Sequence, residues 1–97
     1  MKFAFIIMGD FSSPGECASV SRGEARIAAV SGLREACVFA RKFAEEGIGC
    51  IELCGAFGEE DARAVVSATE GKIPVGYVTR LPEQDALYRE IFVDKGK

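Results

Sequence analysis

The fold is decided by residues 26–79, RIAAVSGLREACVFARKFAEEGIGCIELCGAFGEEDARAVVSATEGKIPVGYVT, in which three apolar strand-like runs alternate with two amphipathic helical patterns. This strand-helix-strand-helix-strand order predicts a parallel sheet, because neighbouring parallel strands need a crossover and a helix is the usual one. The middle run ends in Cys54-Gly55-Ala56-Phe57-Gly58, a glycine-containing turn between a strand and a helix. The order of the elements therefore indicates an α/β domain.

Further strands are expected before residue 26. The run Phe3–Met8 is apolar at every position, which is typical of a central strand covered on both faces. Residues 17–21 could pair with Ala25–Val30 across the turn at Arg22-Gly23, as a hairpin. With the runs at 49–54 and 74–79, this gives a sheet of four or five strands.

Two main helices and a short one are expected. Ser31 is a suitable N-cap for a helix over residues 32–46, and Gly47 stands where a left-handed residue would end it. A second helix is expected from Gly58 to Gly71, with three acidic residues in its first turn. Pro82 is typical of a helix start, and a short helix with an apolar stripe is expected after it. The stripe consists of Leu87, Tyr88, Ile91 and Phe92, and from Ile91 onward the helix could fray or give way to a strand.

The sequence thus predicts a single α/β domain over residues 1–97, with a mostly parallel, mixed sheet. A length of 97 residues fits one domain, and 48% hydrophobic with 28% charged residues is ordinary for a globular protein. A net charge of −3 argues against nucleic acid and membrane surfaces as partners. Phe3–Met8 is too short for a signal peptide and is followed by Gly9-Asp10, so we expect a cytoplasmic protein whose four cysteines are thiols.

Three segments resemble a known family. Met1–Gly9, Gly47–Gly58 and Lys72–Tyr77 are similar to small microbial proteins catalogued as a domain of unknown function, and the similarity extends over nearly the whole chain. The resemblance implies a compact α/β fold and supplies no catalytic residues. Gly47–Gly76 also reads like one βαβ unit of a TIM-barrel enzyme, an analogy only, because the chain is far too short for a barrel.

The absence of histidine excludes Ser-His and Cys-His nucleophile pairs and histidine metal ligands. Cys50-x-Glu52-x-Cys54 superficially resembles a metal clip, but no second cysteine pair exists to complete a zinc site. The turn from Gly55 to Gly58 lacks the residues of a P-loop or a dinucleotide fingerprint, and the acidic helix start opposes a bound phosphate. We therefore expect neither a metal nor a cofactor.

The sequence allows two roles for Cys54 and two for Glu52. Cys54 precedes a helix N-terminus, where a thiol can become reactive, or it is a small apolar core residue. Glu52 interrupts an apolar strand, so it either pairs with Arg26 or Arg80 or faces a pocket as an acid or base. Asp10 and Arg80 follow predicted strands at the carboxyl edge, where ligands bind in open α/β sheets, although each could be a solvated loop charge.

Three hypotheses for the function follow. The first is a homo-oligomer that binds a small ligand or a partner at the carboxyl edge. The ligand-binding residues would be Asp10, Cys54, Gly55, Phe57 and Arg80. The second is a small enzyme with carboxylate or thiol chemistry, whose candidate catalytic residues are Glu52, Cys54 and Asp10, with Arg80 orienting the substrate. The third is a structural subunit of an assembly.

We expect a dimer because the first strand is apolar on both faces, while two helices and a short third cover little more than one face of a sheet. Val38 adds an apolar residue to the polar side of the first helix.

Overall fold

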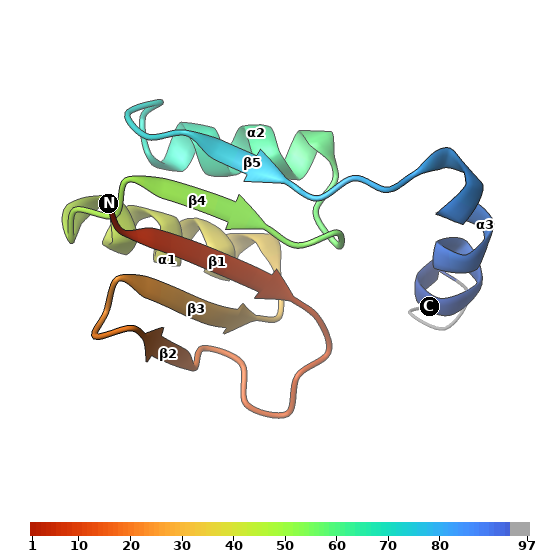
Figure 1. The fold of residues 1–97 in the computed structure, drawn as a ribbon, viewed down its shortest axis with the longest axis horizontal. Coiled ribbons are helices and arrows are strands. Elements are labelled where there is room, and N and C mark those ends of the chain that lie inside the picture. Colours follow the sequence, from red (N-terminus) through yellow and green to blue (C-terminus); the bar gives the residue numbers. More distant parts are fainter. Residues whose placement is uncertain (94–97) are drawn as a thin grey trace.

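The strands form one five-stranded sheet in the order β2-β3-β1-β4-β5. The structure, a computed structural model, describes residues 1–93 (Figure 1). At the centre, β1 (Phe3–Met8) pairs in parallel with β3 (Ala25–Val30) and with β4 (Cys50–Leu53). β5 (Val75–Tyr77) continues the parallel ladder beyond β4, and β2 (Cys17–Val20) pairs antiparallel with β3. The predicted mixed, mostly parallel sheet and the predicted hairpin are both confirmed.

The two main helices lie on the same side of the sheet (Figure 1). α1 (Leu33–Glu45) connects β3 to β4, and α2 (Glu59–Ala68) connects β4 to β5. Gly47, with a φ of 89°, follows α1 in the left-handed conformation that glycine adopts without steric cost. The predicted end of the first helix is therefore confirmed.

The starts of the two helices are capped differently. At α2 the prediction is confirmed, because the Gly58 N–H donates a hydrogen bond to the Asp61 carboxylate at 3.0 Å. At α1 the predicted N-cap, Ser31, is wrong: the cap residue is Gly32. The chain leaving β3 stays extended through Gly32, so Ser31 lies one residue too early, and its N–H donates to Glu35 Oε1 at 2.8 Å instead.

The hydrophobic core lies between the sheet and the two helices. Side chains alternate between the faces of a strand, and the residues that face the helices are fully buried. They include Ala4 and Ile6 from β1 and Ile51 and Leu53 from β4. Phe43 of α1 and Val65 of α2 fill the space opposite them. The folded chain is thus a two-layer structure with one buried sheet face.

The other side of the sheet carries no covering element in residues 1–93, and we call it the open face. Phe3 and Phe5 of β1 point to this side, and each is 43% exposed. The expectation that β1 is covered on both faces is therefore wrong for the single chain, because both helices lie on one side. By the alternation and register of the strands, the open face consists of Phe3, Phe5, Ile7, Ala18, Val20, Ala25, Ile27, Ala29, Cys50 and Glu52.

After β5 the chain forms three short consecutive helical segments, η1 (Pro82–Gln84), α3 (Asp85–Tyr88) and η2 (Arg89–Val93). Together with Leu81 we call them the arm. The arm projects away from the sheet beyond the strand ends (Figure 1), and its segments pack on one another rather than on the sheet or on α1 and α2. The short C-terminal helix is confirmed, and helical turns continue where the sequence allowed fraying or a strand. Residues 94–97 lie outside the described residues.

Within residues 1–93, every helix is too short or too polar to cross a membrane.

Substitution of Phe43 with alanine tests the position of the core. Phe43 is 1% exposed between α1 and the sheet, so Phe43→Ala is expected to lower the free energy of unfolding by about 3–5 kcal/mol. Val38→Ala is the matched control on the outer side of the same helix, where we expect a change of about 0.5 kcal/mol or less. Urea unfolding followed by circular dichroism measures both, and equal losses would contradict a core on this side alone.

Candidate functional site

The parallel strands β1, β3, β4 and β5 end at one edge of the sheet, the carboxyl edge, from which the arm also leaves (Figure 1). Cys54, directly after β4, joins two of these strand ends. Its half-buried sulfur accepts a hydrogen bond from the Met8 N–H at 3.3 Å and lies 3.9 Å from the Met8 carbonyl oxygen. The Cys54 thiol therefore bonds to the backbone at the end of β1.

The other proposed residues at this edge differ in how accessible they are. Asp10 is exposed, and its carboxylate makes no hydrogen bond or ion pair within residues 1–93. Gly55 is also exposed, and a Cβ atom added to it would meet only the Val78 side chain, at 3.9 Å. Phe57 is 2% exposed, so its ring packs into the core beneath the edge.

Arg80, the residue before the arm, contacts two side chains of the arm. Its Nε and Nη2 atoms donate to Asp85 Oδ1 at 3.1 and 3.0 Å, and its guanidinium carbon lies 4.7 Å from the centre of the Tyr88 ring. These contacts combine a charge-assisted hydrogen bond with a cation–π interaction. The guanidinium is thus used to hold the start of the arm.

Glu52 lies on the open face and is half-buried. The predicted ion pairs are wrong, because Arg26 pairs with Glu46 at 2.6 Å and Arg80 pairs with Asp85. Arg26 and Glu52 point to opposite faces of the sheet, a difference that the residue types alone do not reveal. In the described chain, Glu52 has no basic partner, and the neighbouring position on β5 is Gly76, where a Cβ would lie 2.9 Å from Glu52 Oε1.

The closest polar neighbour of Glu52 is the Cys50 thiol, whose sulfur is 3.5 Å from Glu52 Oε2. Burial raises the pKa of Cys50, and the hydrogen bond to the Glu52 carboxylate and its negative charge raise that pKa further. Cys50 is consequently held as a neutral thiol, which is a poor nucleophile. The pair offers a hydrogen-bond acceptor on an apolar surface rather than an activated sulfur.

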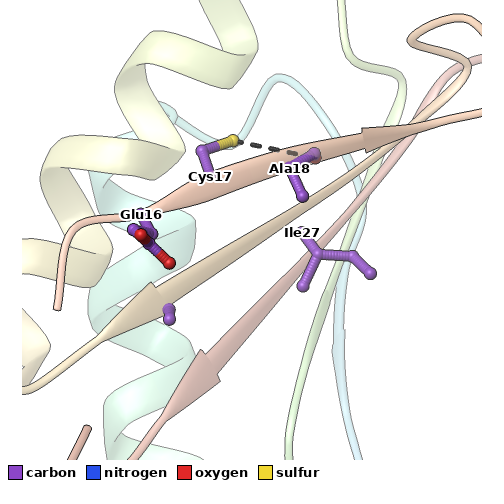
Figure 2. Close-up of a pocket in the computed structure, with 5 residues that line it drawn as sticks. Glu16, Cys17, Ala18 and Ile27 are labelled. Carbon is purple, nitrogen blue, oxygen red and sulfur yellow. Dashed lines mark hydrogen bonds between the residues drawn. The ribbon is translucent and has the colours of Figure 1, made fainter. Parts of the chain in front are cut away.

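A shallow hollow of about 440 Å³ lies on the open face over the β2–β3 hairpin, and Glu16, Cys17, Ala18, Ile27 and Ala29 line it. Figure 2 shows Ala18 and Ile27 on the same side of the two strands, and a dashed line joins the Cys17 sulfur to the Ala18 carbonyl oxygen. By the alternation of β2, the Cys17 side chain belongs to the opposite side, where Arg26 Nη2 donates to its sulfur at 3.3 Å. This contact was not expected from the sequence, because it depends on the hairpin register that pairs Ser19 with Arg26.

Hydrogen bonds to the Cys17 sulfur and to the Glu46 carboxylate raise the pKa of Arg26. Its guanidinium carbon also lies 5.5 Å from the centre of the Phe43 ring. Arg26 therefore connects the hairpin to the end of α1 and has a structural role on the helix side of the sheet.

No three histidine, cysteine or acidic side chains within residues 1–93 come together as ligands for a metal ion. The two sulfurs of the Cys50-x-Glu52-x-Cys54 segment have different partners. The Cys54 sulfur, directly after β4, bonds to Met8, whereas the Cys50 sulfur contacts Glu52.

The Cys50–Glu52 pair predicts a change in thiol reactivity. Glu52→Gln removes the carboxylate that raises the pKa of Cys50, so at a fixed pH near 8 a larger fraction of Cys50 is thiolate and alkylation by iodoacetamide is faster. Mass spectrometry of the alkylated peptides measures the rate for each cysteine. Cys17, which is exposed and on the other side of the sheet, is the internal control and should react at an unchanged rate. An unchanged rate at Cys50 would contradict the effect assigned to Glu52.

Comparison with known proteins identifies the family of the chain and no activity. Neither a curated protein nor a solved structure matches it. The model of one family, described as a family of unknown function, matches residues 1–93, which is nearly the whole chain and includes the sheet, both main helices and the arm. The protein therefore belongs to the family of unknown function DUF6506.

Proposed function

We propose that the protein is a homo-oligomer, a dimer in its simplest form, whose copies bind one another through the open face. The observation that carries this proposal is the exposure of Phe3 and Phe5 on the central strand, on the side of the sheet without helices. Apolar patches of this kind on a small domain are typical of interaction surfaces.

The energy available from covering this face is substantial for a chain of this size. Complete burial of one large apolar side chain contributes about 1.5–3 kcal/mol. Phe3 and Phe5 are each 43% exposed and Ile27 beside them is 36% exposed, so covering all three contributes about 2–4 kcal/mol per copy. In a symmetric dimer both copies contribute this energy, which acts against the entropic cost of association.

The groups at the carboxyl edge support binding better than catalysis. At this edge the Cys54 thiol bonds to Met8 and Arg80 is held by Asp85, and at the other end of β4 the Cys50 thiol is kept neutral. The enzyme hypothesis with Glu52, Cys54, Asp10 and Arg80 therefore has less support than the binding hypothesis. A structural subunit would need the same association surface and differs from the proposal only in having no ligand.

A small-ligand site at the carboxyl edge is the second candidate. It is favoured by the exposed Asp10 carboxylate, which has no polar partner in the described chain and follows β1 two residues after the Met8–Cys54 contact. A ligand with a hydrogen-bond donor or a positive charge would suit this carboxylate. We also propose a cytoplasmic location, because all four cysteines are free thiols, as is usual in reducing compartments.

Association is tested by substituting one residue of the open face. Wild type is expected to have at least twice the chain mass of 10.4 kDa by light scattering at micromolar concentration. Phe5→Lys places a charge at the centre of the proposed interface and is expected to weaken association at least 100-fold, roughly 3 kcal/mol, giving a mass of 10.4 kDa.

Val38→Lys is the matched control, because Val38 is 44% exposed, about the same as Phe5 at 43%, but lies on α1 away from the open face. This variant should keep the wild-type mass. A monomeric wild-type protein, or equal dissociation of the two variants, would overturn the proposal.

The second candidate is tested by ligand screening with NMR. A bound cationic or hydrogen-bond-donating small molecule is expected to shift the amide signals of Asp10 and Gly55, and Asp10→Asn should weaken its affinity about tenfold or more, the effect of losing a charged hydrogen bond. Shifts confined to other regions, or unchanged affinity in the variant, would contradict this site.

A further inference from the structure

We propose that the open face of each copy is covered by the arm of a second copy, in a dimer that exchanges its arms reciprocally. The inference rests on the proposed self-association and names the surface that fills the open face. It is carried by a second apolar surface on the same chain, which has no partner of its own.

That second surface is one side of the arm. Leu87, Tyr88, Ile91 and Phe92 line a hollow of about 210 Å³ together with Gln84. Leu87, Ile91 and Phe92 are each more than half exposed, and Leu81 at the start of the arm is 62% exposed. Within residues 1–93 the main contacts of the arm are among its own segments, and these apolar side chains are left exposed.

The arm lies beyond the ends of the strands and not over the open face of its own chain (Figure 1). The ladder of β5 continues to Val78, whose N–H donates to the Leu53 carbonyl oxygen at 3.1 Å. Two residues later, Arg80 is bonded to Asp85 of the arm and lies over the Tyr88 ring. In this arrangement the arm leaves the open face of its own chain uncovered, so that face is accessible to the arm of a second copy.

Reciprocal exchange covers both the open face and the apolar side of the arm in each copy. Each copy contributes one open face and one arm, and a two-fold axis lets both contacts form at once, which closes the assembly. Direct packing of the two open faces would leave both arms uncovered. Arm exchange covers both surfaces of each copy, whereas a face-to-face dimer covers only one of them.

Mixing two defective variants tests the exchange. The face variant is Phe5→Lys, which keeps the arm intact, and the arm variant combines Leu87→Lys with Ile91→Lys, which keeps the face intact. Each variant alone is expected to have a mass of 10.4 kDa by light scattering. An equimolar mixture should form a heterodimer of one copy of each, because one arm and one face remain compatible. Native mass spectrometry identifies this species, and its affinity should be lower than that of wild type because one of the two contacts is lost.

Glu83→Lys is the control for added charge on the arm, because Glu83 is exposed and does not line the apolar hollow. This variant should remain dimeric. A far-UV circular dichroism spectrum that matches wild type at 25 °C in every variant establishes that the fold of the single chain is intact.

The outcomes separate this inference from the proposed function. If the arm variant remains dimeric, or if the mixture yields no heterodimer, arm exchange is overturned while self-association through the face stands. If wild type is monomeric, the proposed function itself fails, and the arm exchange with it.

Discussion

The handedness of the crossovers determines the rest of this structure. From β3 to β4 and from β4 to β5 the chain moves across the sheet in the same direction, and in each case the connection contains a helix. Parallel crossovers are almost always right-handed, so two crossovers in one direction place both helices on the same side. The connection that runs the other way, from β1 to β3, contains the strand β2 instead of a helix, so within residues 1–93 no helix covers the opposite side. One core and one open face follow from this topology.

This constraint explains why the apolar pattern of β1 has two different consequences. Ala4 and Ile6 face the helices, and both are fully buried. Phe3 and Phe5 are larger and lie on the side without helices. A strand that is apolar on both sides, in a sheet covered on one side, is understandable if the second side is covered in the assembled protein.

The local features of the fold could be predicted from the sequence because they depend on neighbouring residues. Gly47 ends α1 through its own conformation, and the Asp61 carboxylate caps α2 at a residue three positions earlier. The side-chain pairs at the candidate site depend on which face a residue occupies and where distant strands meet. Arg26 was expected near Glu52, but the register and the alternation place the two on opposite faces. Arg80 pairs with Asp85, five residues later in the chain, and not with Glu52.

The two outer strands limit the ways in which copies of this sheet can combine. β5 has three residues and follows Pro74, and β2 has four. Short edge strands and a flanking proline offer few unpaired backbone groups to another sheet. Growth by adding strands edge to edge is therefore disfavoured, although the sheet has an apolar side. Within residues 1–93, both edges of the sheet are therefore poor templates for a further strand.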